Sequence, residues 1–158
     1  AYKFNDYPIE APIRDLGNVL MTIFESTHFQ MDTSSLNSNL EWRSIYSGPY
    51  TLHLGEEHRI FLIALYHQTH CLRGLEYAFL FPNSTAYTPH HIQHCLNYLR
   101  QHFLCQADDE LETGDFIEWN SSPGSVYHKD RVCRDWKQVH DAAAEDLDDF
   151  TTYLSVKI

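Results

Sequence analysis

The sequence predicts an α+β domain in which a small antiparallel sheet packs on two helices, with a disulfide-tied C-terminal segment. Segments of strand length lie before residue 66, segments with helical spacing follow between residues 67 and 105, and four cysteines lie from Cys71 onward. A chain of 158 residues can bury a core of its own, so we expect residues 1–158 to form one domain.

The strands of the expected sheet lie in the first part of the chain. Residues 18–29 are apolar and partly β-branched, which favours a strand, whereas residues 31–40 are rich in Ser and Asn and are expected to form a loop. Residues 41–54 predict two short strands around a turn at Ser47, Gly48 and Pro49. Residues 59–66 form a continuous apolar run, which is typical of a buried strand.

Two helices are expected next, over residues 67–79 and from Pro89 to Cys105. Pro82 follows the first helix, and Thr88 before Pro89 is a favourable N-cap in front of a favourable first helical residue. Residues 117–131 are expected to be irregular. Residues 135–154 are acidic and have helical spacing, so we expect a last helix there.

The charge balance excludes some partners. The chain has 11 Lys and Arg against 22 Asp and Glu, a formal net charge of −11. Binding to nucleic acid requires a basic face that neutralises phosphates, and docking on anionic lipids requires basic clusters; the sequence has neither. We therefore expect no nucleic-acid partner and no membrane contact by this segment.

The most informative pattern is a five-residue motif, His-x-x-His-Cys, that occurs twice in the expected helices. The first copy is His67, His70 and Cys71, and the second is His91, His94 and Cys95. Positions i, i+3 and i+4 share one face of a helix, so each copy directs two imidazoles and one sulfur the same way. Imidazole suits copper, zinc and iron, so the sequence predicts a transition-metal site, with copper favoured and iron or zinc as alternatives.

Two points in this motif stay open from the residues alone. His90 is adjacent to His91 and lies four residues before His94, so His90 could replace His91 as a ligand. In a simple antiparallel hairpin, the first motif would lie about 10 Å further from the connecting loop than the second, judged by helical rise. The loop over residues 80–88 is long enough to correct this offset; otherwise the two motifs serve different metals, or a site shared between two chains.

The cysteines also have alternative roles. Cys71 and Cys95 could be thiolate ligands, or they could form a disulfide between the two helices, with Cys105–Cys133 as a second bridge. Sequons at Asn83 and Asn120 favour the secretory pathway, where disulfides are stable. Structural zinc is an alternative to a redox metal. A zinc hydrolase of the HExxH type is disfavoured because neither motif has Glu between its histidines.

Beyond this pattern, the segments HQTHCL, HHIQHCLNYLRQHFLCQADDELE and VCRDW resemble the UstYa-type proteins of fungal secondary metabolism, named for ustiloxin biosynthesis. The resemblance spans residues 59–136. It implies a copper-dependent oxidase that acts on a peptide or other natural product by oxidative cyclisation, dehydrogenation, hydroxylation or halogenation. Many members act in pairs, which implies a homo- or hetero-dimer with a homologue, and a catalytically silent partner of such a pair is the alternative function.

The resemblance also implies a location and residue roles. Most members carry an N-terminal transmembrane helix that places this domain in the secretory lumen, and these 158 residues contain no such run, so a luminal or secreted form is expected. The metal candidates are the histidines and cysteines of the two motifs. Tyr98 is a candidate pocket or radical residue, and Asp108 could orient a ligand imidazole or form a surface salt bridge. Arg131 departs from the family pattern, which often has His there.

Overall fold

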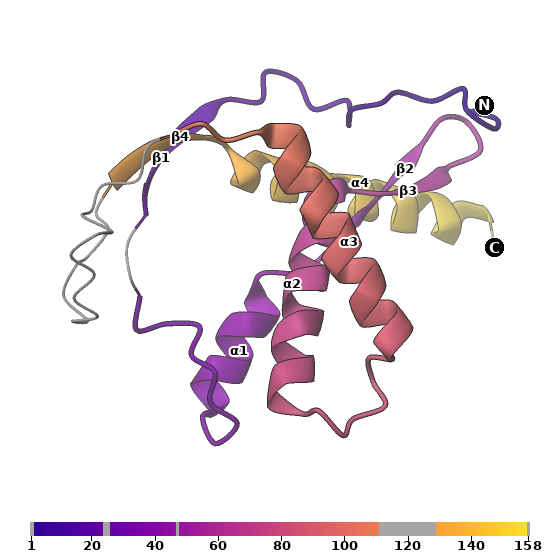
Figure 1. Cartoon of the computed structure of the whole chain (residues 1–158). Helices are drawn as coiled ribbons and strands as arrows, with labels where there is room; N and C mark the ends of the chain where they lie inside the picture. Colours follow the sequence, from indigo (N-terminus) through magenta and orange to yellow (C-terminus); the bar gives the residue numbers. More distant parts are fainter. Residues whose placement is uncertain (1, 24–25, 47, 111–128, 158) are drawn as a thin grey trace.

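The computed structural model describes residues 2–23, 26–46, 48–110 and 129–157 (Figure 1). Its elements are, in chain order, β1 (Asn18–Ile23), α1 (Leu36–Ser44), β2 (Thr51–Leu54), β3 (Arg59–Leu62), α2 (Ala64–Leu80), α3 (Pro89–Gln106), β4 (Lys129–Arg134) and α4 (Trp136–Lys157). The α+β class predicted from the sequence is confirmed. None of these helices is both long enough and apolar enough to cross a membrane.

The strands form two separate antiparallel pairs and not the single sheet expected from the first 66 residues. β2 and β3 form a hairpin, in which Gly55 takes the left-handed conformation with φ of +77°. β1 instead pairs with β4, in a register that runs from Asn18 opposite Arg134 to Ile23 opposite Lys129. The end of the segment that was expected to be irregular therefore forms part of a strand. The sequence did not reveal this strand because its partner lies more than a hundred residues earlier in the chain.

The prediction of a loop and then a strand before Ser47 was wrong, because α1 lies there. Ser35 caps this helix by accepting a hydrogen bond from the backbone N–H of Ser38. The indole N–H of Trp42 then donates to the backbone carbonyl of Gln30 at 3.1 Å, which holds the helix against the segment before it. Ser and Asn side chains form hydrogen bonds with nearby backbone groups, which favours these residues both in loops and at helix N-caps. Composition alone therefore did not distinguish a loop from the start of a helix.

The strand expected from the apolar run before the first motif ends earlier than expected. β3 stops at Leu62, and α2 begins at Ala64, so Tyr66 lies in the first turn of the helix. A short apolar run fits a buried strand and a buried helix segment equally well, which explains the error. The first motif therefore lies within the helix and not at its start.

α4 packs on the β2–β3 hairpin through a buried histidine. The His53 imidazole contacts the Asp146 carboxylate at 2.7 Å, and the His53 backbone N–H donates to both oxygens of that carboxylate at 3.0 Å. The His53 ring stacks on Phe150 with the centroids 3.7 Å apart. Asp135 accepts a hydrogen bond from the Lys137 backbone N–H at the start of α4, so the expected last helix is confirmed with a later end.

α2 and α3 cross as an antiparallel pair whose buried contact centres on Cys71, Cys95 and Leu99 (Figure 1). The loop over residues 81–88 runs back along α2, as its Tyr87 ring packs directly over Gly74. A Cβ atom on Gly74 would lie only 2.7 Å from Tyr87 Cε1. This contact removes the offset expected for a simple hairpin and brings the two motifs level.

All four cysteines are free thiols in the structure, so neither of the two expected bridges is present. Cys71 and Cys95 lie buried beside each other between α2 and α3, whereas Cys105 is exposed at the end of α3. The C-terminal segment is held instead by the pairing of β4 with β1 and by the packing of α4 on β2.

Gly74→Val is expected to destabilise the domain by about 1–3 kcal/mol, because the added methyl groups overlap the Tyr87 ring in an already packed site. Urea unfolding followed by circular dichroism measures this loss. The Gly74→Val, Tyr87→Ala double variant should lose less than the sum of the two single changes, because the clash is absent. A single variant as stable as the wild type would show that the loop does not rest on Gly74.

Candidate metal centre

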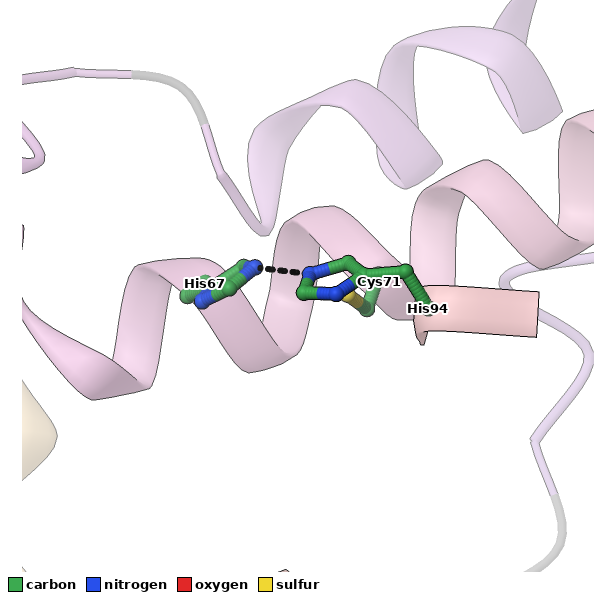
Figure 2. Close-up of side chains that lie close together, drawn as sticks. All are labelled: His67, Cys71 and His94. Carbon is green, nitrogen blue, oxygen red and sulfur yellow. Dashed lines mark hydrogen bonds between the residues drawn. The ribbon is translucent and has the colours of Figure 1, made fainter. Parts of the chain in front are cut away.

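The two His-x-x-His-Cys motifs face each other across the α2–α3 interface in antiparallel order. His67 lies opposite His94, with the two Nε2 atoms 3.1 Å apart (Figure 2). His70 lies opposite His91, with the ring centroids 5.5 Å apart. The structure therefore brings the two motifs together within one chain, and neither a shared site between two chains nor separate sites are needed to explain them.

Within the described residues, one group of side chains has metal-ligand geometry: His67, Cys71 and His94 (Figure 2). Their ligand atoms all lie within 4.8 Å of one another. Two imidazole nitrogens bound to one tetrahedral ion at 2.0–2.1 Å lie about 3.3 Å apart. The observed separation of 3.1 Å between the Nε2 atoms is close to that value, so the two rings are placed to share an ion with little movement.

The electrostatic surroundings keep the first motif's imidazoles neutral. Burial lowers the pKa of His67, and the nearby His94 and His70 lower it further because a second positive charge would be repelled. The pKa of His70 is lowered for the same reasons, first by burial and then by His91 and His94. Metals bind the neutral imidazole, so at neutral pH these two residues are in the form that a ligand requires.

The Cys71 sulfur is less ready to bind a metal than the two rings, because it is protonated. Burial and the adjacent Cys95 thiol raise the pKa of Cys71 to about 12, so the metal-free protein holds it as a thiol. A metal would have to displace that proton before the sulfur could coordinate. His67 and His94 are therefore the first candidate donors of this group, and Cys71 is a third candidate whose coordination would depend on the metal itself.

The lowered histidine pKa values predict a pH dependence of stability in the metal-free protein. Since the folded state holds His67 and His70 with pKa values below 6.5, the unfolded chain binds protons first as the pH falls. The contribution of these groups is fully present above pH 6.5 and is lost as the pH falls through their folded pKa values. The His67→Gln, His70→Gln variant should lose less stability than the wild type between pH 7 and pH 5 in urea titrations; an equal loss would contradict the assignment.

Aromatic rings extend from the histidine cluster in both directions along the helix interface. Tyr98 stacks on His67 with the centroids 4.0 Å apart, and the Tyr98 and His102 rings form a T-shaped pair with the centroids 4.4 Å apart. At the other end, Tyr87 lies 5.1 Å from His91 and so links the connecting loop to the second motif. Tyr98 is therefore placed beside the candidate ligands, where its ring restrains the orientation of the His67 imidazole.

Three contacts of the cluster escaped the sequence analysis. Tyr46, from the segment after α1, lies edge-on to His70 at 5.8 Å, and nothing in the local sequence links the two residues. Gln68, which lies between the two histidines of the first motif, contacts the His102 ring at 3.0 Å. Tyr87 directly precedes the N-cap Thr88, at the end of the loop that returns along α2. That position beside the second motif was the signal that could have predicted the contact of Tyr87 with the cluster.

Two candidates lie elsewhere. His90 is exposed on α3 and does not belong to the His67, Cys71 and His94 group. The Asp108 carboxylate accepts from the Arg131 guanidinium at 2.8 Å, so of the two expected roles the structure shows the salt bridge. Arg131 also pairs with Glu110 at 2.6 Å, which fixes the chain after α3 against β4.

Comparison with known proteins places these features in a family. Residues 51–146 match the family model described as mycotoxin biosynthesis protein UstYa. The chain is also similar to a protein of Diaporthe leptostromiformis named UstYa family oxidase phomYb, with 32% identity over 92 residues. That alignment covers 53% of this chain and 34% of the relative, so the chain spans about a third of the relative's length. No solved structure matches the chain. Because the family match covers more than half of the chain and includes both His-x-x-His-Cys motifs, the chain belongs to the UstYa family.

Proposed function

We propose that this domain is a copper-dependent oxidase that acts on a peptide or other natural product. The observation that carries the proposal is the pairing of His67 with His94, at 3.1 Å between the Nε2 atoms, in a group that includes Cys71. The name of the Diaporthe relative, an oxidase, supports the reaction class. The family's description as mycotoxin biosynthesis proteins supports a natural-product substrate.

The donor set favours copper over the alternative of structural zinc. Two imidazoles and a sulfur combine ligands that copper binds well in both of its common oxidation states. A structural zinc site would be closed by four protein ligands, whereas this group has three donors and an exposed member, His94. Zinc has no redox chemistry of its own, so a zinc site would not support an oxidase.

The residues of this chain have distinct tasks in the proposed site. His67 and His94 would hold the copper, with Cys71 as the third donor, and bound copper would supply one-electron chemistry with O₂. Tyr98 packs on His67 and keeps its ring facing His94. Cys95 and Leu99 lie beneath the group and exclude water from its inner side.

Location and partners follow from the same proposal. Asn83 lies exposed in the loop between α2 and α3, where a glycan could be attached without displacing the buried interface. This supports a luminal or secreted domain. The second expected sequon, at Asn120, lies outside the described residues. A homologous partner, as a homo- or hetero-dimer, remains part of the proposal.

The proposal is tested with the copper-loaded, desalted protein and a pool of synthetic peptides under air with ascorbate. We expect at least one peptide to lose two hydrogens or to gain one oxygen, as detected by mass spectrometry. The product should be absent without O₂, with zinc in place of copper, and with the His67→Ala, His94→Ala variant. Products that form equally with that variant would come from unbound copper and would contradict the proposal. Bound copper with no product from any peptide would favour a silent partner.

A further inference from the structure

A cavity of about 350 Å³ opens beside the candidate metal centre. It is formed by residues from three parts of the chain: the segment between α1 and β2, the end of β3, and the first two turns of α2. Its lining residues are Tyr46, Tyr50, Leu62, Tyr66, His67 and His70. His67 belongs both to this lining and to the metal-ligand group, so whatever occupies the cavity lies next to a ligand of the ion.

We propose that this cavity is a substrate subsite that binds one uncharged, flat, mainly apolar group, such as an aromatic ring. The inference rests on the proposed function, because it assigns the cavity to the substrate of that site. It adds the chemical class of the group that is bound and the residues that select it.

The chemistry of the lining selects this class. Three phenol rings and one aliphatic side chain form the walls, with two imidazoles on the side of the metal centre. Tyr46 stands edge-on to His70, at an interplanar angle of 76°. An aromatic ring bound in the cavity can therefore contact the edge of one aromatic side chain and the face of another. Among the described residues that line the cavity, none carries a carboxylate, ammonium or guanidinium group. In the metal-free protein, a charged group would therefore lose its hydration without gaining a counter-charge.

The size of the cavity limits what it can hold. Small-molecule sites usually measure about 300–1,000 Å³, and this cavity lies at the lower end of that range. It can accept a ring-bearing group of small-molecule size but not a whole peptide. The rest of the substrate must therefore lie outside, along the exposed side that Tyr50 and Leu62 border.

The lining also provides matched variants. Leu62 is 54% exposed, so Leu62→Trp can fill the cavity from its rim without replacing a core residue. Leu96 on α3 is equally exposed at 54% and lines a different hollow, which makes Leu96→Trp the control for adding an indole.

The test uses 4-methylphenol as the probe and 4-methylbenzoate as its charged counterpart, with binding to the metal-free protein measured by ligand-observed NMR. We expect the phenol to bind at least tenfold more tightly than the benzoate. Leu62→Trp should weaken phenol binding at least tenfold, and Tyr50→Ala should weaken it as a second, cavity-opening variant. Leu96→Trp should leave binding unchanged. Equal phenol binding by the wild type, Leu62→Trp and Tyr50→Ala would overturn the subsite.

A second readout places the probe relative to the metal. In the copper(II)-loaded protein, the relaxation of the probe's ring protons should be strongly enhanced, and zinc loading should abolish that enhancement. No enhancement in protein that retains copper would overturn the subsite while leaving the metal site in place. Selective, Leu62-dependent binding to a protein that takes up no copper would support the binding pocket and overturn the proposed oxidase, so the two failures are distinguishable.

Discussion

His67→Ala is expected to weaken copper binding by at least 100-fold, while His90→Ala leaves it unchanged. The two residues differ in position and not in chemistry. His67 faces His94 at 3.1 Å within the ligand group, whereas His90 is exposed on the same helix as His94 and lies outside that group. Loss of a residue that merely supports a metal ligand costs about 10–100-fold in affinity, so loss of a direct ligand should cost at least as much.

A competition titration against a chromophoric copper chelator measures both affinities. His90→Ala is the matched control because it also removes one imidazole, from the helix that carries His94, and leaves the total charge unchanged. If both variants lost affinity equally, His90 would share the site and the pairing of His67 with His94 would not define it. If neither lost affinity, the copper would be bound elsewhere on the chain.

Glu76→Leu is expected to destabilise the domain by about 3–5 kcal/mol, because it leaves a buried guanidinium without its counter-charge. Arg73 and Glu76 form an ion pair one helical turn apart on α2, with side chains only 8% and 4% exposed. Arg73 also reaches Asn39 on α1 and lies over the Tyr77 ring, so it joins α1 to α2. Water can therefore reach the Arg73 guanidinium only if α1 and α2 separate.

The double variant Arg73→Leu, Glu76→Leu distinguishes a buried charge from a general loss of packing. Removing both charges eliminates the unpaired guanidinium, so the double variant should be clearly more stable than Glu76→Leu alone. Chemical unfolding of the three proteins gives the coupling energy. A double variant as unstable as the single one would mean that packing, and not the unpaired charge, causes the loss.

The local signals in the sequence correctly predicted the helices that carry the site. Thr88 and Pro89 located the start of α3, where the structure shows the Thr88 hydroxyl accepting from the His91 backbone N–H. The repeated spacing of His, His and Cys also predicted that each motif would point one way from its helix. Capping and helical periodicity depend on residues only a few positions apart, so one sequence is enough to reveal them.

The features that the sequence did not reveal depend on contacts between distant residues. The pairing of β1 with β4 joins Val19 to Cys133, and no local pattern specifies such a partner. The level arrangement of the two motifs depends on Tyr87 packing over Gly74, which only the folded loop creates. Tyr46 reaches His70 because α1 turns the chain back toward α2, and α1 itself was mistaken for a loop and a strand.

The most direct test of this account is the metal content of the protein purified without chelators, determined by elemental analysis beside the His67→Ala, His94→Ala variant. The account predicts close to one equivalent of copper per chain in the wild type after loading and desalting. The double variant, folded by circular dichroism, should retain almost none. Copper retained equally by both proteins, or absent from the wild type after loading, would contradict a copper site between α2 and α3.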